Sequence, residues 1–223
     1  MNVKTILSKF GFSLFLIVCV EVFVILILLN QGSSDVLGGD GRSFYHPTAI
    51  NLLQDGSFSL LNENNVFEPT MGKPPGYSFF LAFIYFFTGN SIIAVKIVQF
   101  ILFWLIGLGI YRLAKQFVDE KTSRISAILA VTYLPLVFLN LYHASEVLAT
   151  FLVVWTICKA IDWKESDKKV DVISTASLFG LLTVVRPNWA LFAIPIFGMI
   201  YLSKRIKAVP NLIIFALVSA LFI

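Results

Sequence analysis

Residues 10–29 read FGFSLFLIVCVEVFVILILL, an apolar run that contains one charged residue, Glu21. As a helix rising 1.5 Å per residue, this run would be about 30 Å long, which is the thickness of the hydrocarbon core of a bilayer. It is longer than the apolar part of a signal peptide, and Asn30-Gln31-Gly32 follows it instead of a cleavage site made of small residues. The run therefore predicts a retained membrane-spanning helix.

The composition of the 223-residue chain agrees with a membrane protein. Apolar residues make up 58% of the chain and charged residues 13%, whereas about 25% of a soluble domain is charged. Because polar groups could not cover so much apolar surface in water, a soluble enzyme, a disordered chain and a disulfide scaffold are excluded. Cys19 and Cys158 lie inside apolar runs and have no metal-ligand spacing. In a membrane protein a net charge of +4 reports orientation, so we expect no nucleic-acid partner.

Residues 30–74, which follow the first run, are rich in Gly, Asn, Ser and Asp. This segment is too polar to lie in lipid and longer than a plain connection, which is typical of a functional loop with short helices of its own. Within it, residues 47–53 place apolar side chains at roughly helical spacing, as an interfacial helix would. We interpret residues 30–74 as the first extracytoplasmic loop, carrying short juxtamembrane helices.

Loop cations predict which of the later apolar runs cross the membrane. These runs cover residues 75–87, 91–113, 126–142, 147–163, 172–185, 189–202 and 211–223. If the 75–87 run does not cross, 13 of the 17 Lys and Arg residues fall on the side of the N-terminus, as the positive-inside rule favours for the cytoplasm. About 13 residues are also too short to span a bilayer. The fold class predicted is thus an all-α, polytopic transmembrane helical bundle with a cytoplasmic N-terminus and a re-entrant or interfacial helix at 75–87.

The final run begins at residue 211 and is still apolar at Ile223. It lacks the polar flank, basic anchor or aromatic belt that usually ends a span. We therefore expect residues 1–223 to form a single transmembrane domain that is the N-terminal part of a longer, C-terminally truncated protein.

Two carboxylates on the predicted outer side are candidates for chemistry. Asp40 lies in a glycine-rich segment and is followed by Arg42, Tyr45 and His46. Glu146 follows His143-Ala144-Ser145 at the beginning of an apolar run. Simpler interpretations remain open at this point, because Gly and Asp favour turns, and Ser145 with Glu146 suits the N-terminus of a helix.

Two cations on the same side are candidates for binding an anion. Lys73 precedes Pro74-Pro75-Gly76-Tyr77, and it could equally be an anchor at the membrane interface. Arg186 lies in the Arg186-Pro187-Asn188 connection between two short apolar runs. A cation at such a tip is costly in an apolar environment unless an anion accompanies it.

The order of these motifs resembles that of a known family. It consists of Asp40-Gly-Arg-Ser-Phe-Tyr45 and Ala49-Ile-Asn-Leu-Leu53-Gln-Asp-Gly56, then Lys73-Pro-Pro-Gly-Tyr77, Tyr133-Leu-Pro135, Ser145-Glu146 and Gly180-Leu-Leu-Thr-Val-Val-Arg186-Pro187. The order is similar to that in the N-terminal half of GT-C glycosyltransferases of the protein O-mannosyltransferase and lipid A aminoarabinose transferase type. Each motif is short, so the specificity of the resemblance comes from their order.

The resemblance implies transfer of a sugar from a polyprenyl-phosphate donor to a lipid, glycan or protein acceptor on the extracytoplasmic face of the plasma (inner) membrane. It gives Asp40 the role of general base in an in-line displacement. Glu146 would orient the acceptor or the sugar, or hold a metal. Lys73 and Arg186 would bind the donor phosphate, with further substrate contacts from Tyr45, Arg42, His46 and Tyr77.

The chain departs from the family pattern after Asp40, where Gly41 replaces the second acidic residue of many members. No cofactor is required by these residues, and a divalent cation stays an open alternative. Two other classes of function also remain open at this point. A transporter or flippase for lipid-linked or polar cargo would use broken helices and a buried arginine, and a non-catalytic assembly protein would use neither carboxylate for chemistry.

Overall fold

Helices make up most of the part of the chain that the computed structural model describes, residues 37–61, 66–70, 72–166 and 168–222. The predicted first span at 10–29 lies outside these residues. The described elements, in chain order, are the π-helix η2 (Gly41–Tyr45), α2 (His46–Asp55), β1 (Ser59–Leu61), β2 (Phe67–Pro69), α3 (Gly76–Thr88), α4 (Ile92–Ala114), α5 (Glu120–Val131), α6 (Leu134–Asn140), α7 (Ser145–Ser166), α8 (Lys169–Val185), the 3-10 helix η3 (Pro187–Phe192), α9 (Ala193–Lys204), the 3-10 helix η4 (Arg205–Ala208) and α10 (Val209–Ala220). The all-α prediction is confirmed, apart from one short hairpin.

Within the described ranges, α4 is the one helix that is both long and apolar enough to cross a bilayer. It begins after Ser91, whose Oγ accepts a hydrogen bond from the backbone N–H of Ala94 at 3.2 Å. The predicted non-crossing segment is α3, which has 13 residues and falls short of the roughly 20 that a span needs. The number of crossings derived from loop cations stays a prediction.

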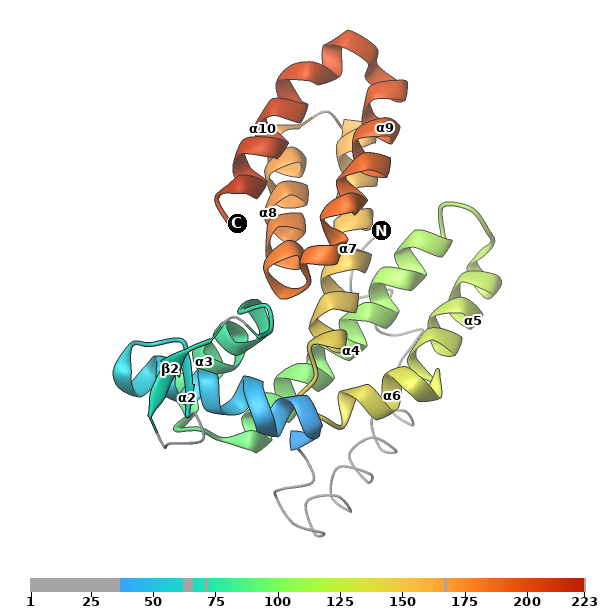
Figure 1. Cartoon of the computed structure of the whole chain (residues 1–223). Helices are drawn as coiled ribbons and strands as arrows, with labels where there is room; N and C mark the ends of the chain where they lie inside the picture. Colours follow the sequence, from blue (N-terminus) through green and yellow to red (C-terminus); the bar gives the residue numbers. More distant parts are fainter. Residues whose placement is uncertain (1–36, 62–65, 71, 167, 223) are drawn as a thin grey trace.

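The apolar run at 126–142 does not form the single helix that we expected. The structure divides it into α5, which ends at Val131, and α6, which begins at Leu134 and turns away from the line of α5 (Figure 1). Pro135 explains the division, because its ring lacks an N–H and clashes with the carbonyl four residues earlier. The connection toward Glu146 therefore runs across the end of the bundle.

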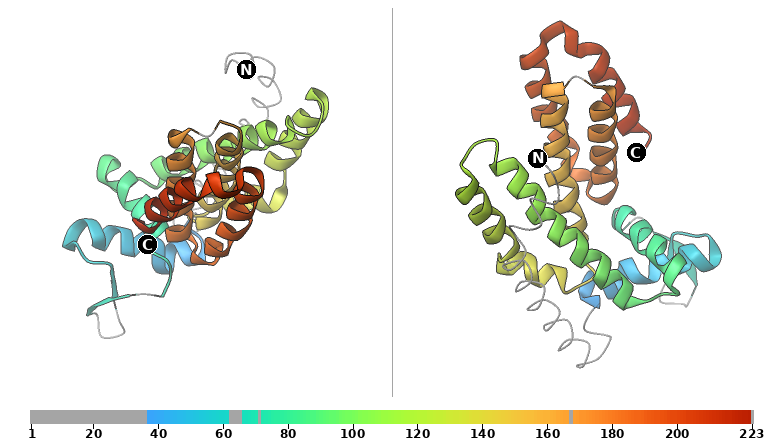
Figure 2. Two further views of the ribbon diagram at one scale, coloured as in Figure 1. Left: turned by 90° about the horizontal axis from the view of Figure 1, so that it is seen from above. Right: turned by 180° about the vertical axis from the view of Figure 1, so that it is seen from behind.

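Helix α7 lies at the centre of the described structure. It packs against α4 on one side and α8 on the other, and α10 packs against α8 (Figures 1 and 2). Trp163 and Phe215 are buried in the cluster that joins α7, α8, α9 and α10, with their rings stacked at 5.8 Å. Helix α7 therefore connects the two groups of helices.

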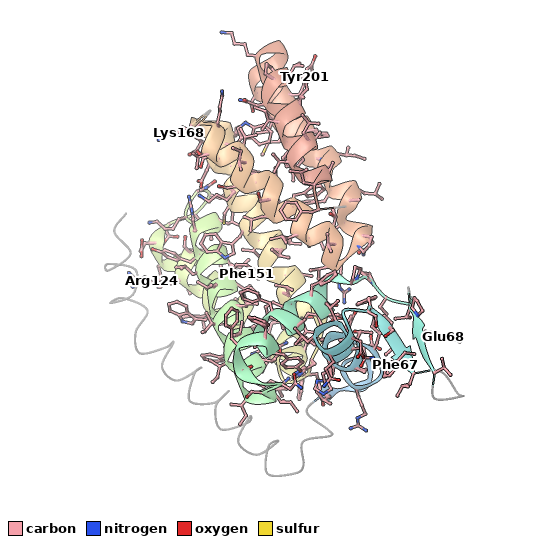
Figure 3. All side chains as sticks on the ribbon, turned by 90° about the vertical axis from the view of Figure 1, so that its left-hand side faces the viewer. Phe67, Glu68, Arg124, Phe151, Lys168 and Tyr201 are labelled. Carbon is pink, nitrogen blue, oxygen red and sulfur yellow. The ribbon has the colours of Figure 1, made fainter. Side chains whose placement is uncertain are left out.

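The described part of the first loop lies at the end of the molecule where α7 begins. The helix predicted at 47–53 is present as α2, which packs on α3 and ends at Gly56 in the left-handed conformation, φ +66°. Strands β1 and β2 pair antiparallel and project beyond α2 and α3, where Phe67 and Glu68 are labelled in Figure 3. The hairpin was not predicted, because two three-residue strands leave almost no alternating pattern in the sequence.

Candidate functional site

Asp40 is positioned by a close approach between the first loop and the segment before α7. Asp40 directly precedes η2, and a Cβ atom at the next residue, Gly41, would lie 2.7 Å from Cβ and 2.9 Å from the carbonyl oxygen of His143. Only glycine allows the two backbones to come this close. The absence of a second acidic residue after Asp40, noted above as a departure from the family, thus has a steric reason in this chain.

Lys73 forms an ion pair with Asp40. Its ammonium also lies 5.7 Å from the centre of the Tyr45 ring, within the range of a cation–π interaction. The lysine side chain is 30% exposed and the aspartate side chain 64% exposed, so the pair lies at the edge of the site, open to solvent. One predicted catalytic residue, Asp40, and two predicted binding residues, Lys73 and Tyr45, therefore meet here.

Arg186 is turned toward the N-terminus of α7. Pro187 keeps the preceding residue extended, and Arg186 ends α8 with φ −146° and ψ 94°. From this position Nη2 forms an ion pair with Glu146 and donates to Ser145 Oγ at 3.1 Å, while Nε donates to the same oxygen at 3.3 Å. Arg186, at the tip of the helix pair, thus has an anionic partner that offsets the free-energy cost of placing a cation in an apolar environment.

A second close approach brings Lys73 and Arg186 to the same end of the molecule. A Cβ atom at Gly76, the first residue of α3, would lie 2.6 Å from the backbone nitrogen of Val185 and 2.7 Å from the carbonyl oxygen of Val184. The start of α3 therefore rests directly on the last turn of α8. Lys73 lies just before this contact and Arg186 just after it.

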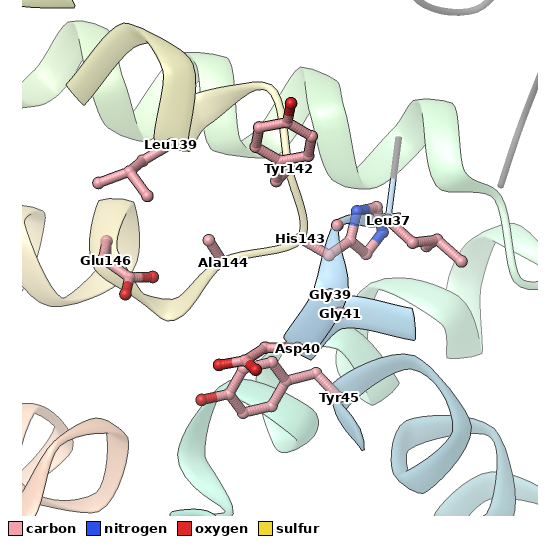
Figure 4. A pocket seen from close by; sticks show the side chains of 11 residues that line it. Leu37, Gly39, Asp40, Gly41, Tyr45, Leu139, Tyr142, His143, Ala144 and Glu146 are labelled. Atoms are coloured by element: carbon pink, nitrogen blue, oxygen red, sulfur yellow. The ribbon is translucent and has the colours of Figure 1, made fainter. Parts of the chain in front are cut away.

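A pocket of about 410 Å³ lies beside the two ion pairs. The carboxylates of Asp40 and Glu146 and the hydroxyl of Tyr45 are directed toward the same space (Figure 4). The remaining walls come from the glycine-rich turn and the segment between α6 and α7, namely Leu37, Gly38, Gly39, Gly41, Leu139, Tyr142, His143 and Ala144. Both carboxylates predicted from the sequence thus line one pocket.

Tyr45 is the predicted binding residue that lines this pocket; Lys73 and Arg186 pair with its carboxylates without lining it, and three others neither line it nor form these pairs. His46 Nδ1 lies 2.7 Å from the hydroxyl of Tyr85, which lies 3.3 Å from His143 Nε2, so His46 belongs to a polar chain behind the pocket. Burial lowers the pKa of His46, which favours its neutral form. Tyr77 is fully buried, with its ring 4.9 Å from that of Tyr45, and Arg42 is exposed on η2.

The structure adds residues that sequence reasoning did not select. Ser145 holds Arg186, and Tyr142 and His143 line the pocket. Their one signal in the sequence is their position directly before Glu146. Among the residues that the structure describes, no group of three or more His, Cys, Asp or Glu side chains is placed to hold a metal ion.

A family model described as dolichyl-phosphate-mannose-protein mannosyltransferase matches residues 72–223, about two thirds of the chain. The chain belongs to this family. Its members are membrane glycosyltransferases of the GT-C type, as the resemblance implied. The match includes Lys73, Glu146 and Arg186 but begins after Asp40, so the role of Asp40 depends on the geometry. No curated protein and no solved structure matches the chain.

Proposed function

We propose that this chain transfers a sugar from a polyprenyl-phosphate donor to the hydroxyl group of an acceptor, at the extracytoplasmic surface of the plasma membrane. The observation that supports this proposal most directly is the convergence of four charged residues from four separate segments beside one pocket. Asp40 pairs with Lys73, Glu146 pairs with Arg186, and both carboxylates line the pocket. Such a site offers a base and a set of cations at adjacent positions.

The proposed reaction is an in-line displacement at the anomeric carbon. Asp40 accepts the proton of the acceptor hydroxyl while the hydroxyl oxygen bonds to the anomeric carbon. The bond between that carbon and the phosphate oxygen breaks, and its electron pair leaves with the lipid phosphate. Lys73 and Arg186, each about one-third exposed, stabilise the negative charge on that phosphate.

Glu146 has a different role in this scheme from Asp40. Its carboxylate is bound to Arg186, and the arginine is also held by Ser145. Glu146 and Arg186 are each about one-third exposed, whereas the Asp40 side chain is 64% exposed, so Asp40 is the carboxylate that an acceptor hydroxyl reaches more readily. We assign Glu146 to the orientation of Arg186 and of the sugar in the pocket.

The family supports a particular donor and acceptor. Its description names dolichyl-phosphate-mannose and protein, and on this basis we propose mannose on an isoprenoid phosphate as the first donor to test and a protein hydroxyl as the first acceptor. Lipid and glycan acceptors are the alternatives. A lipid-linked donor agrees with a site built at one end of an apolar helical structure.

The deciding experiment is sugar transfer by the Asp40→Asn variant in membrane vesicles supplied with radiolabelled mannosyl-phosphoryl polyprenol and acceptor. We expect the rate to fall by at least about 100-fold, since general base catalysis contributes on the order of 10²–10⁴. Asp55→Asn is the matched control, because Asp55 is an exposed carboxylate at the end of α2 that does not line the pocket. Transfer retained by Asp40→Asn would remove Asp40 from the role of base.

A chelator tests whether the reaction also needs a divalent cation. We propose that Lys73 and Arg186 are sufficient to balance the phosphate, and on that basis EDTA leaves the rate unchanged. Loss of transfer with EDTA, and its recovery on adding Mg²⁺ or Mn²⁺, would instead assign a metal to the carboxylates of the pocket.

A further inference from the structure

The two cations assigned to the donor phosphate are held in different ways. The described contacts of Arg186 use Nε and Nη2, which face Ser145 and Glu146. A guanidinium has five N–H donors in a planar fork, so its Nη1 side can bind a phosphate oxygen while the other edge stays in place. Arg186 can therefore bind a donor without leaving Glu146.

During the reaction Lys73 cannot contact both the Asp40 oxygen that accepts the proton and the leaving phosphate oxygen. Two oxygens that accept hydrogen bonds from one tetrahedral ammonium lie about 5 Å apart. In an in-line displacement the base and the leaving oxygen lie on opposite sides of the anomeric carbon. With a hydrogen bond of about 2.6–3.2 Å to the acceptor and an attack distance of about 3–3.5 Å, these two oxygens are separated by roughly 6–7 Å.

We propose that Lys73 changes partner from Asp40 to the donor phosphate, and that Asp40 becomes available as a base only when the donor is bound. This inference rests on the proposed function and adds an order of events, in which the donor binds before the acceptor is activated. Tyr45 supports the exchange, because its ring lies under the ammonium and keeps it in the site when it leaves the carboxylate.

The exposure of the pair makes the exchange inexpensive. Asp40 is 64% exposed and Lys73 30% exposed, so water replaces the ammonium at the carboxylate once the pair separates. Ion pairs of this kind change an equilibrium constant by about 1.4- to 5-fold, which corresponds to 0.2–1 kcal/mol. Binding of a phosphate by both Lys73 and Arg186 can supply the free energy that is needed to separate this pair.

The test is the affinity of the full chain in detergent micelles for a polyprenyl monophosphate, measured by equilibrium binding. Removing the competing carboxylate with Asp40→Asn frees Lys73, so we expect this variant to bind the lipid phosphate about 1.4- to 5-fold more tightly than the wild type. Asp55→Asn removes an equal charge from the same loop outside the pocket and should bind like the wild type. Far-UV circular dichroism and size-exclusion chromatography confirm that each variant is folded.

A double-mutant cycle separates partner exchange from simple repulsion between Asp40 and the phosphate. If Asp40 acts by occupying Lys73, the gain from Asp40→Asn disappears in the Lys73→Gln background. A gain that persists there, or an affinity of Asp40→Asn equal to that of the wild type, would overturn the exchange and leave the proposed function standing. A wild-type chain that binds no polyprenyl phosphate would instead refute the proposed donor, and the exchange with it.

Discussion

The two ends of α7 both carry ion pairs, but they are built differently. At its N-terminal end Glu146 pairs with Arg186 beside a pocket that Asp40 also lines. Near its C-terminal end Asp162 pairs with Arg112 at 2.5 Å and with Lys159, one turn earlier in the same helix, at 3.2 Å. The two carboxylates are about 24 Å apart along the helix axis.

A second cluster near the C-terminal end of α7 shows how local such pairs can be. Glu120 accepts hydrogen bonds from Lys115 at 2.6 Å and from Arg124 at 3.0 Å, both within five residues of it. The hydrogen bonds from Lys115 and Tyr111 hold the pKa of Glu120 at about 2. Charge density alone therefore does not distinguish the two ends. The candidate site is distinguished by its pocket, which the carboxylates of two separate ion pairs line.

The largest difference between the ends should appear on replacing their arginines. Arg186→Gln removes a cation from the proposed phosphate site and leaves Glu146 without its partner, so we expect sugar transfer to fall by about 10²–10³. Arg112→Gln removes a cation that pairs with Asp162 far from the pocket and should keep transfer within about twofold of the wild type. Equal losses in both variants, with membrane insertion intact, would contradict the contrast.

A second pair of substitutions compares stability at two glycines, one in a close contact and one in open space. Gly76→Ala places a Cβ atom against the backbone of α8, which cannot move aside as a side chain would, and we expect the free energy of unfolding to fall by about 1–3 kcal/mol. At Gly198 in α9, nothing lies within 4 Å of an added Cβ atom, so Gly198→Ala should be neutral or slightly stabilising. Thermal unfolding in detergent measures both. Equal stability of the two variants would show that α3 can move away from α8.

The close contacts at two glycines, Gly41 and Gly76, also show which part of the site could not be predicted from the sequence. The helices α3, α4, α7 and α8 follow apolar runs and could be placed to within a few residues. The break at Pro135 was missed because an apolar run hides a change of direction. The resemblance assigned Asp40, Lys73, Glu146 and Arg186 to one substrate site, but it did not predict which of them pair. Their pairing depends on the contacts at Gly41 and Gly76, which no local pattern encodes.

Ser145 was missed for a related reason. Its hydroxyl is a suitable helix cap in the sequence, whereas in the structure it accepts two hydrogen bonds from Arg186. Ser145→Ala should raise the KM for the donor by roughly 2- to 10-fold with a smaller change in kcat, since a hydrogen bond of this kind contributes about 0.5–1.5 kcal/mol. Ser166→Ala, at the last residue of the same helix, is the control and should leave both constants unchanged.

The smallest effect that we expect is a dependence of stability on pH through His46. Burial lowers its pKa in the folded chain, so the unfolded chain binds the proton more readily, and the folded state loses stability as the pH falls through about 6.5. Thermal unfolding midpoints between pH 8 and pH 5 measure this loss, which should be reduced in His46→Gln. The same slope in the variant would assign it to another group. A smaller slope in the variant would assign the loss of stability to His46, whose Nδ1 lies 2.7 Å from the Tyr85 hydroxyl in the folded chain.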